Sequence, residues 1–287
     1  MSLIVGSAAV GCATSPLIEG ALYADEVFQD GITFTSRYKT ANAGQIQVVV
    51  DNNDSILVPK TPGSDFDRNA YANSVVNINC TNGFILEQDI PNFYVATLTP
   101  DIEADAVIEA TKKIMEGRQG AGLACLVKEG IAATDTTALT TSNIKDKILD
   151  TRLELRKKFA KADVVIARSE IYNLMLKVAG TTYTPIYNDE VNREGRIGRW
   201  LGMTFVEANL IDKYDTLKYH DGTALQSVDM SAVDFLMYDH SAMSIIDVLA
   251  GMRTIDSPHF FGVEVQGELD AGFKVTRAAA VAVHSHS

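Results

Sequence analysis

The glycines near the N-terminus form the pattern in this sequence that comes nearest to a cofactor site. Gly6, Gly11 and the small residues between them follow the apolar run Leu3–Val5, and the acidic pair Asp25–Glu26 lies at the distance of a ribose-binding acid. Pro16, however, falls inside the helix that such a loop must open, and no second strand of a βαβ unit follows. We therefore predict no cofactor site here and interpret the segment as an extended arm. A dinucleotide-dependent oxidoreductase stays open as the second alternative.

Other reactive residue types are present without a reactive spacing. The histidines are His220, His240, His259, His284 and His286. Only the last two lie close together, and we interpret them as residues of the C-terminal tail and not as metal ligands. Loops or a helix start account for the carboxylate clusters, which are Asp65/Asp67, Asp101/Glu103/Asp105 and Asp189/Glu190. No zinc-protease, Walker or nucleophile-elbow motif occurs. The sequence therefore predicts no catalytic residue, no cofactor-binding residue and no metal ligand.

The cysteines and the N-terminus indicate the cellular compartment in which the protein is made. Cys12, Cys80 and Cys125 are far apart and odd in number, which favours synthesis in a reducing cytoplasm over a disulfide framework. Ala9–Cys12 looks like a lipoprotein cleavage box, but the first basic residue is Arg37, so the positive region of a signal peptide is missing. No apolar run reaches the length of a membrane span.

The composition is that of an ordinary globular protein. The 287 residues are 46% hydrophobic and 22% charged, which is enough for a large core in one or two domains. The net charge of −12 argues against a surface built to bind nucleic acid or an acidic membrane. An acidic protein would suit a container that must not adhere to enclosed DNA.

Residues 163–210 predict an α/β unit around which the other elements are arranged. Asp163–Ala167 is apolar and rich in β-branched residues, as a buried strand is. Ser169 suits the N-cap of the following helix, and Gly180 suits its end. The apolar stripe of this helix is Ile171, Leu174, Met175 and Val178. A glycine-punctuated turn and the strand Met203–Ala208 complete the unit.

Residues 37–98 predict an extended β excursion. Ile46–Val50 and Val76–Cys80 are typical of strands, and the second alternates apolar with polar residues. The Asn82-Gly83 pair predicts a hairpin turn into Phe84–Leu86. Because such a ribbon has little apolar mass, we expect it and the arm at 1–36 to contribute little to the core of the subunit and much to contacts with neighbours.

Two helices are predicted next, separated by a polar linker at 130–141. The first covers 101–128, although glycines at 117, 120 and 122 weaken its second half. The second covers 143–160, with Asn143 and Asp146 as a capping pair. Its apolar stripe is Ile144, Ile148, Leu155 and Phe159. Its basic side, which we interpret as a solvated face and not as a DNA site, consists of Arg152, Arg156, Lys157 and Lys158.

The remainder of the chain predicts strands. Residues 214–222 are interpreted as a charged loop. The expected strands are 233–238, 243–248, 260–267, 272–276 and 278–283.

This order of elements resembles that of phage major capsid proteins with the HK97 fold. In that family a strand, a helix and a glycine-punctuated turn and strand recur, and the matching residues here are Gly195, Ile197, Gly198, Leu201, Gly202 and Val206. The resemblance implies an α+β fold with an A domain, a P domain with a spine helix, an extended E-loop and an N-terminal arm. The bounds it implies are 1–36 for the arm, 37–98 for the E-loop, 99–162 for the P domain, 163–262 for the A domain and 263–287 for the terminal strands.

The resemblance also implies a function. It indicates a structural, non-enzymatic subunit that assembles through pentamers and hexamers into an icosahedral phage or prophage head, as a virion component assembled in the bacterial cytoplasm. Its partners would be other copies of itself and scaffold, portal or decoration proteins, with DNA enclosed without sequence-specific binding and no membrane contact. The shell of an encapsulin-like compartment is the first alternative. Lys39 and Lys60 lie near the excursion, but no acidic catalyst identifies a crosslink, so none is predicted.

Overall fold

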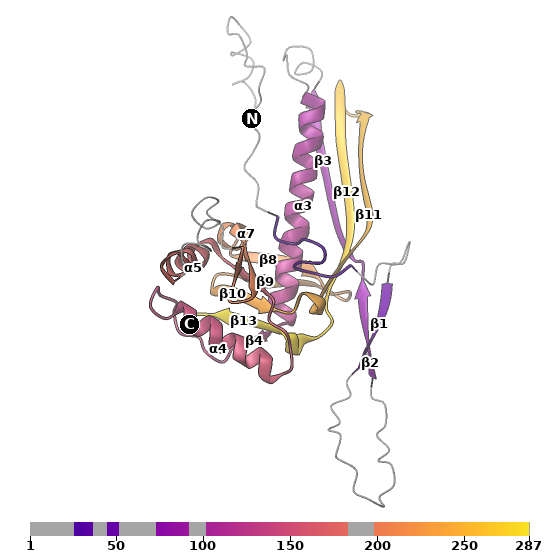
Figure 1. The fold of residues 1–287 in the computed structure, drawn as a ribbon. Coiled ribbons are helices and arrows are strands. Elements are labelled where there is room, and N and C mark those ends of the chain that lie inside the picture. Colours follow the sequence, from indigo (N-terminus) through magenta and orange to yellow (C-terminus); the bar gives the residue numbers. More distant parts are fainter. Residues whose placement is uncertain (1–25, 37–44, 52–72, 92–101, 183–197, 287) are drawn as a thin grey trace, which may run out of the picture.

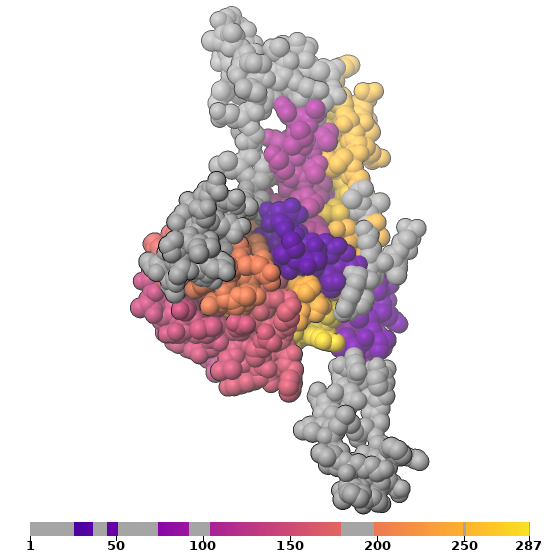
Figure 2. All heavy atoms as spheres, viewed as in Figure 1, coloured from indigo at the N-terminus to yellow at the C-terminus, as the bar shows by residue number. Residues whose placement is uncertain are grey.

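The protein consists of a compact body and an elongated body that share one long helix (Figure 1). A computed structural model describes residues 26–36, 45–51, 73–91, 102–182 and 198–286. A small two-stranded ribbon extends from the region where the two bodies meet (Figure 1, Figure 2). Within the described ranges, no helix combines the length and the apolar character that a membrane crossing requires.

The compact body is built on a six-stranded mixed sheet. In spatial order its strands are β4 (Ile131–Ala132), β13 (Val281–Ser285), β10 (Val233–Tyr238), β5 (Val164–Ala167), β7 (Met203–Glu207) and β6 (Arg199–Trp200). β10 runs antiparallel to both β13 and β5, and β5 runs parallel to β7. Every residue of β5 and β10 is buried, as expected for strands covered on both faces. The strands predicted within 163–210 and at 233–238 are confirmed.

Two helices pack beside this sheet. They are α4 (Ile144–Lys157) and α5 (Ser169–Thr182). The stripe of α5 is confirmed, since Ile171 and Met175 are buried and its other two members pack against the same core. In α4, Ile144, Ile148 and Leu155 are buried as predicted. The fourth predicted member, Phe159, is wrong: it lies beyond the end of α4 with its side chain fully exposed.

The predicted capping pair of α4 is also wrong. Asn143 is at the N-cap position but makes no capping bond to the helix. Its Oδ1 instead accepts a hydrogen bond from the backbone N–H of Thr140 at 2.7 Å. The side chain therefore stabilises the turn before the helix, a common alternative for asparagine.

The N-terminus of α5 is capped from a distant part of the chain. The backbone N–H of Ser169 donates to the Asp212 carboxylate at 2.7 Å, and Asp212 belongs to the short helix α7 (Asn209–Lys213). Arg168 holds the same carboxylate at 3.1 Å. Ser169 is thus the first helical residue and not the predicted cap. The helix also continues two residues past Gly180, where its end was predicted.

Two glycines of the punctuated stretch lie directly before β6 and in the turn between β6 and β7. Gly198 and Gly202 have φ of 58° and 78°, a backbone region that glycine enters without steric cost. Leu201, between them, is also at positive φ, 53°.

A hairpin packs against the long helix where a loop was predicted at 214–222. It consists of β8 (Thr216–His220) and β9 (Leu225–Asp229). Leu217 and Tyr219 are buried, and the residues between and before them are exposed. Two apolar positions among charged neighbours are too few for a clear alternation in the sequence, which is why the strand was missed.

The elongated body is a three-stranded antiparallel sheet with one helix along it. The sheet order is β11 (Met243–Asp256), β12 (Gly262–Val275) and β3 (Asn82–Pro91), and the helix is α3 (Ile102–Glu129). Ile90, Ala106, Ala110 and Val265 form the buried cluster between helix and sheet. The short strands predicted from 243 to 276 are therefore parts of two strands of 14 residues each.

The helix α3 continues through its glycines for 28 residues, so the predicted weakness does not interrupt it. A Cβ at position 117 would lie 3.0 Å from the ring of Phe84, and one at 122 would lie 2.6 Å from the ring of Phe28. Glycine at these positions lets two aromatic rings reach the helix backbone. The packing gained this way offsets the low helix propensity of glycine.

The hairpin predicted at Asn82-Gly83 is wrong. β2 (Asn73–Asn79) pairs with β1 (Gln45–Asp51), and β3 pairs with β12, so β2 and β3 are not partners. Asn82 instead exchanges two hydrogen bonds with the backbone of His220, accepting at 2.7 Å and donating at 3.1 Å. A buried side chain thus joins the two bodies at the place where the local signal suggested a turn.

The described part of the arm belongs to the main core. Val27, Phe28 and Phe34 are buried in the same cluster as the six-stranded sheet. For residues 26–36 the expectation of a small contribution to the core is therefore wrong. The sequence could not reveal this, because the partners of these rings lie on α3, far along the chain.

Candidate assembly surfaces and polar clusters

The ribbon formed by β1 and β2 has one covered and one open face. Ile46, Val48, Val50 and Ile78 pack together with Ile246 at the start of β11. Val49 and Val75 point to the opposite face and are exposed. Because neighbouring residues of a strand face opposite sides, the packing on Ile246 covers one side of this two-stranded ribbon and leaves the side with Val49 and Val75 exposed. The exposed side is available to a neighbour.

Residues 26–36 are held against α3 by specific polar contacts. The backbone N–H of Val27 donates to Gln119 Oε1 at 3.0 Å. The guanidinium of Arg118 forms two hydrogen bonds with Asp247, at 2.8 and 2.9 Å, and lies over the ring of Phe34. The bidentate pair joins α3 to β11 and braces the segment between them.

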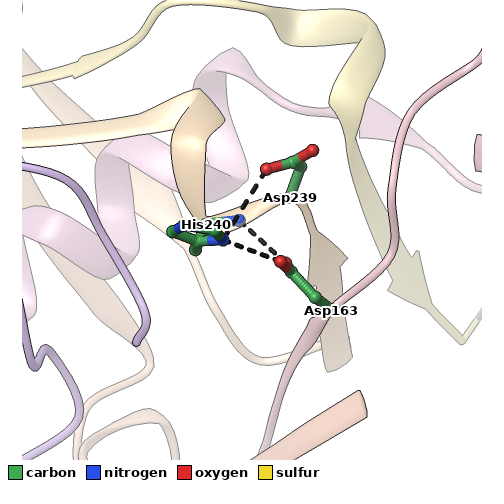
Figure 3. Close-up of side chains that lie close together, drawn as sticks. All are labelled: Asp163, Asp239 and His240. Atoms are coloured by element: carbon green, nitrogen blue, oxygen red, sulfur yellow. Dashed lines mark hydrogen bonds and ion pairs between the residues drawn. The ribbon is translucent and has the colours of Figure 1, made fainter. Parts of the chain in front are cut away.

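A second polar cluster joins the start of β5 to the end of β10 (Figure 3). His240 Nδ1 lies 2.7 Å from Asp163 Oδ2 and 3.8 Å from Asp239 Oδ1. The backbone N–H of His240 donates to the other oxygen of Asp163 at 2.9 Å. Asp239 Oδ1 accepts from the backbone and the hydroxyl of Ser241, at 2.9 and 2.7 Å. Sequence analysis missed this group because antiparallel pairing of β5 and β10 brings it together.

These three residues have the types that bind a transition metal, but both oxygens of Asp163, Nδ1 of His240 and Oδ1 of Asp239 already make hydrogen bonds. Both oxygens of Asp163 accept from His240, and the Lys161 ammonium lies 3.5 Å from one of them. A cation in that position competes with a metal ion. These hydrogen bonds join the start of β5 to the end of β10 and stabilise their pairing.

One of the two histidines near the C-terminus is part of the core. His284 is fully buried in β13, stacks on Phe235 at 4.8 Å between ring centroids, and places Nδ1 3.0 Å from Asp234. His286 Nδ1 lies 2.8 Å from the other oxygen of the same carboxylate. Because the oxygens of a carboxylate only accept hydrogen bonds, each histidine donates its Nδ1–H to the buried Asp234. The interpretation of His284 as a tail residue is wrong.

An acidic face lies on the side of the long sheet away from α3. Glu87, Asp89 and Glu264 place carboxylate oxygens within 4.8 Å of one another, and Glu264 is buried. Ile85, on the same side of β3, has 77% of its surface exposed. We call these four residues the acidic sheet face.

Most other residues considered for chemistry lie outside the described ranges. They are Gly6, Gly11, Cys12, Asp25, Lys39, Lys60, Asp65, Asp67, Asp101, Asp189 and Glu190. Asp105 lies in the first turns of α3, as the interpretation of a helix start requires.

The described cysteines are free thiols that resist ionisation. Burial raises the pKa of Cys125 well above its usual value. Burial and, next, Asp270 raise the pKa of Cys80. A nucleophilic cysteine requires the opposite shift, so neither is suited to covalent catalysis.

Comparison with solved structures shows which known fold this architecture matches. A chain from a structure of Mycobacterium phage Che8 superposes with a TM-score of 0.72 at 17% identity, covering 96% of both chains. A chain from the capsid structure of the Cyanophage P-SCSP1u gives 0.70 at 13% identity, covering 98% of this chain and 94% of that one. The chain has the HK97-type capsid fold. A capsid chain of an empty GTA particle also shares the HK97-type fold, with a TM-score of 0.63, 13% identity and coverage of 99% and 97%.

The likeness is one of structure. No protein-family model matches the sequence, and no curated protein matches it. The order of elements, which carried the resemblance in the sequence, extends over the same length as the structural match. The HK97-type fold is therefore encoded here with few residues in common with those chains.

Proposed function

We propose that this chain is the structural subunit of a closed protein shell, the head of a phage or prophage. The observation that carries the proposal is the likeness over nearly the whole chain to capsid chains of a cyanophage and of GTA particles. The likeness to capsid chains covers almost all of this chain, which supports a structural role. The subunit is structural and not an enzyme.

The exposed side of the β1–β2 ribbon supports self-assembly. Val49 and Val75 remain in water in one subunit, and in a closed shell a neighbouring subunit could cover them. We propose that pentamers and hexamers of this chain form the shell. Scaffold, portal and decoration proteins would complete the particle, which would be assembled in the host cytoplasm.

The packing suggests domain bounds that differ from those implied by the sequence. The helix α4 packs on β13 and β10, so we assign it to the A domain and not to the P domain. We propose a P domain of β3, α3, β11 and β12, an A domain from residue 130 to 242 together with 278–286, and an E-loop at 37–81.

The acidic composition supports a container that encloses DNA without binding it by sequence. The chain carries 37 acidic and 25 basic side chains. Contacts with phosphate would require the opposite balance over a broad inner surface. We propose that most of the inner surface repels or ignores DNA.

The first alternative is the shell of a protein compartment, which would use the same fold to enclose an enzyme. DNase-protected DNA in native particles would favour a phage head, and a co-purifying enzyme would favour a compartment. The second alternative, an oxidoreductase, depends on Gly6 and Gly11, which lie outside the described residues. Binding of nicotinamide or flavin nucleotides to the purified protein tests it directly.

Electron microscopy of the purified full chain tests the proposal. We expect regular shells or rings of five and six subunits. A protein that remains monomeric at high concentration, with or without crowding agents, would contradict it. Ribbon variants Val49→Asp and Val75→Asp should remain folded by circular dichroism and fail to form shells.

A further inference from the structure

The end of α4 has an unusual residue in a well-defined motif. The backbone N–H of Ala160 donates to Leu155 O and that of Phe159 donates to Arg156 O, both at 3.0 Å. This pair of bonds defines a Schellman motif, in which the residue in the position of Phe159 adopts a left-handed conformation and is usually glycine. Phe159 has φ of 58° and is 100% exposed.

Phe159 is unfavourable for one subunit in two respects. A residue with a Cβ is strained in the left-handed region, where glycine is not. A phenylalanine ring in water also forgoes the burial that stabilises aromatic residues elsewhere in the protein. The two hydrogen bonds of the Schellman motif offset part of the strain, but no described residue covers the ring. A fully exposed aromatic ring at a strained position points to a contact outside the subunit.

The surroundings of Phe159 indicate the character of that contact. Lys157 and Leu153 are four residues apart on α4, as are Leu153 and Leu149, so they share one outer face. Leu153 is 52% exposed and Leu149 is 36% exposed. We define the Phe159 patch as Leu149, Leu153, Arg156, Lys157, Lys158 and Phe159. Its three basic side chains are exposed and form no ion pair among the described residues.

We propose that the Phe159 patch binds a second copy of this chain, with the phenylalanine ring as its apolar anchor. The inference rests on the proposed function, since a shell brings many copies together. Lys161 is a fourth basic residue, three positions after Lys158. The rest of the chain, without the three basic residues of the patch and Lys161, has 21 basic against 37 acidic side chains. A second copy is thus a predominantly acidic partner. On the acidic sheet face, Ile85, Glu87 and Asp89 are exposed, so this chain has surface of the matching apolar and acidic kind.

The apolar part of the patch distinguishes a protein partner from DNA. Duplex DNA presents phosphates to lysine and arginine but buries its bases in the stack. Two exposed leucines beside an aromatic ring have no partner on such a surface. Aromatic and arginine side chains surrounded by apolar contacts are, in contrast, typical of the residues that dominate protein interfaces.

The variant Phe159→Gly separates the backbone strain at this position from the contact made by its ring. It should make the unassembled subunit more stable and assembly weaker. Glycine relieves the strain, so the unassembled subunit should gain about 2–4 °C in melting temperature. Loss of the anchor should raise the concentration needed for assembly at least about tenfold. Assembly is followed by light scattering and electron microscopy, and melting is measured below the assembly concentration.

Matched variants test the apolar and basic components. Phe159→Leu keeps an apolar side chain and the strain, so it should assemble at a concentration closer to that of the wild type than Phe159→Gly does. Lys157→Glu should impair assembly more than Lys128→Glu, an equal charge change at an exposed position at the end of α3. Equal effects of the two lysine variants would contradict the basic component.

The outcomes distinguish this inference from the proposed function. Shells that form equally well with Phe159→Gly would overturn the inference and leave the shell function intact. If the wild type forms no shells, its self-association in sedimentation velocity decides: loss of association in Phe159→Gly supports the patch, and no difference refutes it. A variant that assembles normally but loses affinity for a short DNA duplex would reassign the patch to nucleic acid.

Discussion

The contact between Phe28 and Gly122 allows a prediction in which Gly122→Ala lowers or raises the stability of the subunit, depending on the residue at position 28. Phe28 is 1% exposed, and a Cβ on residue 122 would lie 2.6, 3.0 and 3.2 Å from three atoms of its ring. The ring is part of a fully packed core with Phe34 at 6.4 Å between centroids, so it has little room to move.

Gly122→Ala combines two opposing effects. Alanine in the interior of α3 should stabilise the helix by about 1 kcal/mol. The clash with Phe28 should cost about 1–3 kcal/mol, as overpacking in cores does. We expect the single variant to be destabilised by up to about 2 kcal/mol.

In a Phe28→Ala background the same change should stabilise the protein. Phe28→Ala alone should cost about 3–5 kcal/mol, the usual range for a buried phenylalanine. With the ring gone, Gly122→Ala keeps only its helix-forming effect and should recover about 1 kcal/mol. The coupling energy between the two sites should therefore be about 1–3 kcal/mol.

Urea unfolding of the unassembled subunit, followed by circular dichroism, measures the four proteins of this cycle. Gly120→Ala is the matched control, because a Cβ there would meet only Leu210 and Leu217, at 3.4 Å each. It should stabilise both backgrounds alike. If Gly122→Ala has the same effect with and without the Phe28 ring, the described arm does not pack on α3 as argued.

Three further predictions concern assembly, the core and pH. Deleting residues 54–72 should leave a folded subunit that no longer assembles, and particles of normal size or outright unfolding would contradict this. Asp234→Asn should cost about 1–3 kcal/mol in urea unfolding, since an amide keeps only one oxygen where His284 and His286 each use one, whereas exposed Asp229→Asn should cost clearly less. The raised pKa of Cys125 means that the unfolded chain releases a proton that the folded chain keeps, so stability should fall above about pH 8.5, by up to about 1.4 kcal/mol per pH unit. Cys125→Ala should reduce the loss of stability between about pH 8 and about pH 10, and an unchanged loss would refute the assignment.

Periodicity in the sequence predicted several of the elements, and the resemblance of their order to a known family predicted the fold. The strand at β5, the stripe of α5 and the strand at β7 follow from short-range patterns of apolar residues, because each element buries one face or both. Their order along the chain was enough to suggest the HK97-type fold. This information is local, so it survives in a sequence that has little identity to chains of the same fold.

The tertiary structure decided the features that depend on partners distant in the chain. Asn82-Gly83 has the sequence of a turn, but pairing of β3 with β12 and the bonds to His220 place it in a strand. Ser169 looks like a cap, but Asp212 supplies the cap from α7.

The same distinction applies to the residues of functional interest. His284 lies near the chain end, and only the pairing of β13 with β10 places it beside Asp234 in the core. Phe159 continues the apolar spacing of α4, yet the helix ends before it and leaves it in solvent. Periodicity reports which face a residue would have if the helix continued; whether the helix continues depends on the hydrogen bonds that terminate it.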